Sequence, residues 1–188
     1  MAKAKSGLVQ KILSAVCLVL SLLLFTTLFM PTFGVISASG EENAMTLSTV
    51  EILQGSFMSN EDLLKLTLED AEKGLKMVTA KALGEAEDAA SYGASIIFSI
   101  GISVLGLIGA IVSLVALLRK GPGMGTIILS FVTTVVGVIL MIVSYTALDQ
   151  LAVAGTRTLN VGAGVWVALV STIAVTACAI TGKVLRKK

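Results

Sequence analysis

The residues that most often carry chemistry are scarce in this chain. Its 188 residues include no histidine, so general-base and metal-ligand roles lose their commonest side chain. No Asp, Glu, Lys or Arg falls inside a long apolar run, where such a group would mark a proton relay or an ion path. The sequence therefore predicts no enzyme, no catalytic residue, no metal site and no cofactor.

The cysteines and the glycine-rich segment also point to structure. Cys17 and Cys178 lie in apolar runs at opposite ends of the chain, and they would be neighbours if those runs pack together. The simpler interpretation is two small apolar residues in helix interfaces. Residues 121–125 (GPGMG) lack the strand, Lys and Ser/Thr of a phosphate-binding loop, so no nucleotide is expected. No basic patch interleaved with aromatic residues suggests nucleic acid.

The composition is that of a membrane protein. Hydrophobic residues make up 55% of the chain and charged residues only 14%, whereas about a quarter of a soluble domain is charged. A membrane-spanning helix needs about 20 mainly apolar residues, and the predicted spans are residues 12–31, 90–118, 124–147 and 159–182. We expect an all-α membrane protein, a four-transmembrane-helix bundle that forms a single integral membrane domain over residues 1–188.

The distribution of charge predicts the orientation. With both termini inside, the inner segments hold nine basic residues and no acidic one, and the outer segments hold five basic residues and all twelve acidic ones. Lys and Arg flank the cytoplasmic ends of spans. The sequence thus predicts a multi-pass protein of the plasma membrane with cytoplasmic N- and C-termini. The absence of outer-loop cysteines and of Asn-x-Ser/Thr sites is compatible with a bacterial membrane.

Residues 33–90 are expected to form an extracytoplasmic loop module between spans one and two. Residues 33–37 and 44–48 are β-prone and flank a run of turn residues, which indicates a β-hairpin. Ser48 and Glu51 fit a capping box that starts a short helix, and Gly55 would close it. The alternative is one longer strand over residues 44–53.

An amphipathic helix follows, capped by Ser59 or Asn60. Its apolar positions are spaced by 4, 3, 4, 3 and 4 residues and form one narrow stripe. The stripe consists of Leu64, Leu68, Ala71, Leu75, Val78 and Ala82. Either it packs on the hairpin or the spans of its own chain, or it contacts another protein, with Leu64, Leu68, Leu75 and Val78 as the contact residues. Whether the helix continues unbroken from residue 60 to 118 is open, and Gly84 is the most favourable break.

Small side chains recur on one face of spans two and four. Helices in lipid gain little from the hydrophobic effect, so close contact across small residues drives their association. The predicted helix-packing residues are Ser95, Ser99, Ser103, Gly106, Ala110, Ser113, Gly164, Ala168 and Ser171. Span two is therefore the expected centre of the bundle.

The order of segments resembles the claudin-like tetraspan plan, with a large first outer loop, a short inner turn and a small second outer loop. Claudins carry a tryptophan motif and paired cysteines in the first loop. This sequence has neither Trp nor Cys there, so the resemblance concerns topology alone and carries over no functional residue.

These features predict a non-enzymatic four-span membrane scaffold or accessory subunit, which acts through its extracytoplasmic loop and its small-residue helix faces. The expected partners are membrane lipid and either further copies of the chain or an unidentified membrane protein. The alternative is an oligomeric pore or channel lined by the Ser, Thr and Gly faces of spans two and three, because polar-lined pores need no charged residue.

Overall fold

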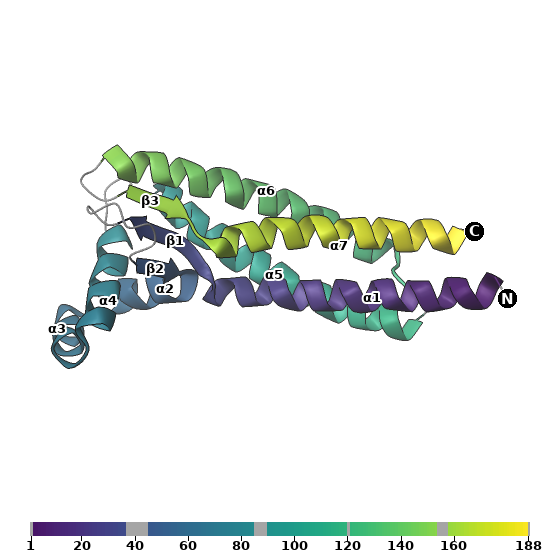
Figure 1. Ribbon diagram of the computed structural model, residues 1–188, viewed down its shortest axis with the longest axis horizontal. Helices are drawn as coiled ribbons and strands as arrows, with labels where there is room; N and C mark the ends of the chain where they lie inside the picture. Colours follow the sequence, from purple (N-terminus) through teal and green to yellow (C-terminus); the bar gives the residue numbers. More distant parts are fainter. Residues whose placement is uncertain (1, 37–44, 85–89, 120, 154–157, 188) are drawn as a thin grey trace. The chain divides into compact units, whose positions relative to one another are not determined.

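The computed structural model describes residues 2–36, 45–84, 90–119, 121–153 and 158–187. Within them, four helical segments are long and apolar enough to cross a membrane: Gly7–Phe29, Gly93–Arg119, Met124–Leu148 and Ala163–Leu185. They belong to α1 (Ala2–Thr26) with the 3-10 turn η1 (Thr27–Phe29), α5 (Ala90–Arg119), α6 (Met124–Val153) and α7 (Ala163–Lys187) (Figure 1). Four such helices fit a multi-pass membrane protein, as the sequence predicts.

The described chain divides into two compact units, and long helices contribute to both. Unit 1 comprises Met1–Thr26, Gly101–Ile139 and Val167–Lys188. Unit 2 comprises Thr27–Ile100 and Leu140–Trp166. The described residues of unit 1 are helical apart from the turn at 121–123, whereas unit 2 contains the strands and the short helices.

Close approach between helices holds unit 1 together. A Cβ atom on Gly106 of α5 would lie 2.8 Å from Leu24 Cβ of α1, and one on Gly137 of α6 would lie 3.0 Å from Thr172 Oγ1 of α7. Between α5 and α6 the chain turns through Gly121, whose φ of 112° is a conformation that only glycine adopts readily. Small residues thus let the backbones of unit 1 touch, which is the main source of helix association in lipid.

Unit 2 is built on an antiparallel three-stranded sheet in the order β2–β1–β3 (Figure 1). Its strands are β1 (Pro31–Ile36), β2 (Met45–Ser48) and β3 (Thr158–Val161). Phe33 of β1 is opposite Leu47 on one side and Val161 on the other. The strands β1 and β2 are the pair that the sequence assigns to a hairpin. The buried core of unit 2 contains Phe33, Leu47, Ile52, Ala80 and Ala147.

Strand β3 corrects the expected start of the fourth span. Residues 159–161 are expected in that span, but in the structure they pair with β1, and α7 begins at Ala163. The N–H of Gly162 donates to Thr32 O at 2.8 Å and prolongs the pairing. A short uncharged segment suits either a strand or a helix end, so its pairing partner decides its conformation.

Three short helices follow β2: α2 (Thr49–Phe57), α3 (Asn60–Glu69) and α4 (Ala71–Gly84). The expected capping box is present, because the Ser48 side chain accepts from Glu51 N and the Glu51 side chain accepts from Ser48 N. Gly55 does not close α2, which continues to Phe57. The alternative of one strand over residues 44–53 is also wrong, since β2 ends at Ser48.

The amphipathic segment is two helices rather than one. The break is at Asp70, whose φ of −145° and ψ of 97° are extended. Asp70 also caps the next helix, since its Oδ1 accepts from Lys73 N at 3.2 Å. The described part of α4 runs to Gly84. Residues 85–89, which follow the break that the sequence favours, lie outside the described chain. The extended conformation of Asp70 by itself excludes a continuous helix from residue 60 to 118.

Candidate partner-binding surface on helices α3 and α4

Helices α3 and α4 form an antiparallel pair. Lys81 Nζ, near the end of α4, donates to Asn60 Oδ1 at the start of α3 at 2.8 Å. At the opposite end of the pair, a Cβ atom on Gly74 would lie 2.8 Å from Thr67 Cβ. Gly74 therefore allows the two backbones to approach closely, where any larger residue would separate them.

Helix α2 lies parallel to α4 on the side of the core. Glu51 and Gly55 of α2 face Lys76 and Ala80 of α4, one turn apart on each helix. A Cβ atom on Gly55 would lie 2.6 Å from Ala80 Cβ. The role of Gly55 is thus close packing against α4. The buried Ile52 lies on the same helix and joins the core of unit 2.

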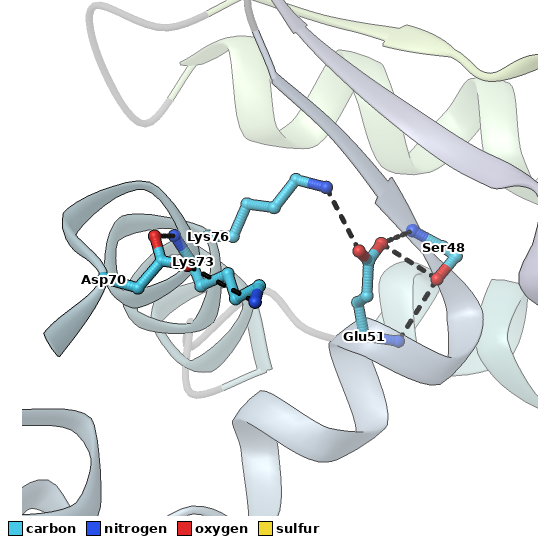
Figure 2. A network of polar contacts seen from close by, with 5 residues as sticks. All are labelled: Ser48, Glu51, Asp70, Lys73 and Lys76. Carbon is cyan, nitrogen blue, oxygen red and sulfur yellow. Dashed lines mark hydrogen bonds and ion pairs between the residues drawn. The ribbon is translucent and has the colours of Figure 1, made fainter. Parts of the chain in front are cut away.

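Glu51 is the polar link between β2, α2 and α4 (Figure 2). Its Oε2 atom accepts from Ser48 N at 2.8 Å and from Ser48 Oγ at 2.9 Å, and its Oε1 atom accepts from Lys76 Nζ at 3.1 Å. Partial burial alone would raise the pKa of the Glu51 carboxyl. The Ser48 N–H and hydroxyl and the Lys76 ammonium outweigh burial and hold this pKa below its ordinary value.

We expect Glu51→Gln to lower stability in a pH-dependent way. Glutamine keeps the capping geometry but loses the ion pair with Lys76. Because solvent partly screens this pair, its loss should lower the unfolding free energy by about 1 kcal/mol at neutral pH. Because the folded pKa of Glu51 is depressed, its contribution is present above the ordinary pKa of 4.5 and disappears as the pH falls through the folded value. The measurement is the unfolding free energy of both proteins along a pH series. A difference that is constant across the acidic range would contradict this assignment.

The junction between α3 and α4 is also organised by a carboxylate (Figure 2). Lys73 Nζ lies 3.3 Å from Asp70 Oδ2, and the backbone N–H of Lys73, followed by its ammonium, lowers the pKa of Asp70. The sequence Asp70-Ala71-Glu72 carries a recognisable signal for a helix start, an N-cap followed by an acid in the first turn. The break at Asp70 could have been predicted from this signal.

The aliphatic stripe of these helices faces outward. The side chains of Leu64, Leu68, Leu75 and Val78 are 64%, 80%, 49% and 44% exposed. The interpretation that this stripe packs against its own chain is therefore wrong. The break at Asp70 changes which positions face inward, and the buried residues of the pair are Leu63, Gly74, Thr79 and Ala80.

A groove runs along the exposed side of the helix pair. It has a volume of about 360 Å³ and is open to solvent. Its lining consists of Asn60, Leu63, Leu64, Thr67, Val78, Lys81 and Ala82. Phe57, at the end of α2, is 86% exposed, although it lies outside the apolar stripe of the sequence. We call Leu64, Leu68, Leu75 and Val78 the outer aliphatic surface.

The predicted helix-packing residues are all buried. In unit 2, Ser95 Oγ lies 2.8 Å from Ser144 Oγ of α6, and a Cβ atom on Gly164 would lie 2.9 Å from Pro31 O. In unit 1, Ser103 Oγ donates to Leu24 O of α1 at 3.4 Å. The other six are Ser99, Gly106, Ala110, Ser113, Ala168 and Ser171.

One polar arrangement in the structure could not be predicted from the sequence, and a second was one of two alternatives. Thr49 Oγ1 lies 2.8 Å from Thr32 Oγ1 and 2.9 Å from Ser99 Oγ, a buried chain of hydroxyls that ties β1, α2 and α5 together. No local pattern reveals such long-range pairs. Cys17 Sγ lies 3.8 Å from Val175 O, one turn before Cys178 on α7. The cysteine-bearing faces of α1 and α7 therefore do meet, with both thiols free.

Comparisons with protein-family models, with curated proteins and with solved structures find no match to this chain.

Proposed function

We propose that the protein is a non-enzymatic membrane scaffold or accessory subunit that binds its partner through the outer aliphatic surface. The observation that carries this proposal is the exposure of Leu64, Leu68, Leu75 and Val78 on a helix pair outside the apolar spans. Large aliphatic side chains that are exposed on a polar helix pair are unfavourable in water, and Leu64 and Val78 line one groove of this pair. Exposed apolar surface of this kind is typical of protein interaction sites.

The partner is a second copy of this chain or another membrane protein. The charge distribution supports a plasma-membrane protein with cytoplasmic termini, which puts α3 and α4 on the extracytoplasmic side. Residues 60–84, which form the helix pair and its junction, carry five acidic and four basic residues. Helices that lie on the bilayer usually have a basic polar face, so this composition favours a protein partner over lipid.

The burial of the hydroxyl faces supports a scaffold over an oligomeric pore. A pore lined by spans two and three would need the Ser and Thr side chains of α5 and α6 to face a shared lumen. Instead, Ser95, Ser99, Ser103, Ser113, Ser130 and Ser144 are each at most 4% exposed within one chain. Purified protein should therefore show no conductance in planar bilayers, and reproducible single-channel currents would argue for the pore.

The test replaces aliphatic side chains of the surface by charged ones. In Leu68→Glu/Leu75→Glu, two carboxylates would be buried at the interface, so we expect at least about tenfold weaker association. The measurement is native mass spectrometry of the complex extracted in mild detergent, where loss of partner leaves the 19.4 kDa chain.

Lys65→Gln/Lys73→Gln is the matched control. It changes the charge of the same helix pair by the same amount, at two exposed positions that do not belong to the outer aliphatic surface. The mass of the complex should therefore stay the same. If the wild type and both variants have the same mass and composition, the proposed interface is wrong.

A further inference from the structure

Unit 1 contains a small cavity, and five of its ten lining residues carry a hydroxyl group. Helices α1, α5, α6 and α7 all contribute to it. Its hydroxyl-bearing residues are Ser21, Ser113, Thr126, Ser130 and Thr133. Each of these residues is at most 6% exposed. The remaining lining is aliphatic, apart from Gly109.

Some of these hydroxyls have a hydrogen-bond partner in the protein and others do not. Ser130 Oγ donates to Ile127 O at 2.9 Å and Thr133 Oγ1 donates to Leu129 O at 2.8 Å, so both keep lone pairs that can accept. By contrast, the buried residues Ser21, Ser113 and Thr126 have no hydrogen-bond partner among the described residues. An unpaired hydroxyl in the apolar interior of a membrane protein is unfavourable.

The size of the cavity sets the class of ligand. It offers about 10 Å³ to the centre of a water molecule, which is the lower limit for holding one water. A buried water needs two to four polar partners, and the cavity supplies donors and acceptors from three helices. The lining carries no charged residue, which disfavours an ion.

We propose that this cavity binds one ordered water molecule, which bridges the hydroxyls of Ser21, Ser113 and Thr126 and so links α1, α5 and α6. Gly109 leaves room beside Ser21, since a Cβ atom there would lie 3.0 Å from Ser21 Oγ. The water supplies the partner that the protein does not, and it connects helices that share no direct hydrogen bond at this position. The hydroxyl faces of α5 and α6 then serve the interior of a single chain.

The test is a double-mutant cycle on unfolding, with Ser113→Ala and Thr126→Val. If one water bridges both hydroxyls, each single variant lowers stability, and the second substitution costs less than it does alone. We expect a coupling of fivefold or more in the unfolding equilibrium constant. If the cavity is dry, each substitution removes an unpaired hydroxyl, so the single variants are neutral or more stable. A coupling below fivefold would overturn the proposal.

Two further cycles calibrate the result. Ser95→Ala with Ser144→Ala should be coupled, because these hydroxyls bond directly at 2.8 Å. Ser113→Ala with Ser144→Ala should be additive, because the two residues belong to different units.

Should the Ser113→Ala/Thr126→Val variant fail to fold, a high-resolution density map of the wild type shows whether a water occupies the cavity. A peak within hydrogen-bonding distance of at least two of the three hydroxyls supports the water, and its absence from well-resolved density excludes it.

Discussion

Gly162→Ala is expected to destabilise unit 2 by about 3 kcal/mol, although it adds a single methyl group. The added Cβ atom would lie 2.6 Å from Pro31 C and 2.8 Å from Thr32 C, and it would also meet Pro31 O. All three are backbone atoms, which cannot rotate aside as a side chain does. Pro31 restricts the adjustment further, because its ring fixes φ.

The clash should be transmitted to the sheet. Gly162 N donates to Thr32 O, and the residues immediately before Gly162 pair with β1 through Asn160 and Val161. Displacing Gly162 would therefore break the connection between β3 and β1. The measurements are the unfolding free energy and the hydrogen exchange of the β3 amides, which should accelerate.

Gly93→Ala is the control for this substitution. Gly93 lies in α5, and a Cβ atom at this position would have no neighbouring atom within 4 Å. Alanine should therefore be neutral here or stabilising by about 0.5–1 kcal/mol. If Gly162→Ala is as stable as Gly93→Ala, the register of β3 on β1 is wrong.

The four apolar helices could be predicted from the sequence because their signal is contained in each segment. A run of uncharged residues long enough to cross lipid needs no information about its neighbours. The capping box at Ser48 and Glu51 is equally local, since both partners lie within one turn. These parts of the fold agree with the structure for that reason.

Strand β3 could not be predicted in the same way. Thr158 to Val161 are uncharged and continue directly into the apolar run of α7, so the sequence alone favours a longer helix. Their conformation depends on β1, which lies more than a hundred residues earlier in the chain. Polar and apolar residues alternate over Thr158 to Val161 as in a strand, but four residues are too few to outweigh the long apolar run that follows.

The outer aliphatic surface shows what periodicity does and does not determine. The spacing correctly places Leu64, Leu68, Leu75 and Val78 in helices. It does not determine which face the chain buries, because a face of small residues can also pack against neighbouring helices. Gly74 and Ala80 permit close contacts that leucine cannot, so the core selects them and leaves the leucines exposed. The exposure of this aliphatic stripe therefore has to be explained by a binding partner rather than by packing within the chain.

Gly106→Leu is expected to separate α1 from α5, with a loss of about 3 kcal/mol or more in the unfolding free energy. A Cβ atom at this position would lie 2.8 Å from Leu24 Cβ, 2.9 Å from Ser21 O and 3.1 Å from Phe25 N. Two of these atoms belong to the α1 backbone, so the helices must move apart to admit even the first carbon of the new side chain. Close contact is what associates helices in lipid, and no gain in hydrophobic burial compensates for its loss.

Gly101→Leu tests whether this effect comes from the contact or from the substitution itself. Gly101 lies on the same helix, and a Cβ atom there would have no atom within 4 Å, so leucine should be tolerated. The measurement is reversible unfolding of both variants in the same detergent or bilayer. If Gly101→Leu is as destabilising as Gly106→Leu, the cost arises from leucine in α5 generally, and the α1–α5 contact at Gly106 is not the reason. If only Gly106→Leu loses stability, the small-residue face of α5 holds α1 by direct backbone contact, independently of any partner bound at α3 and α4.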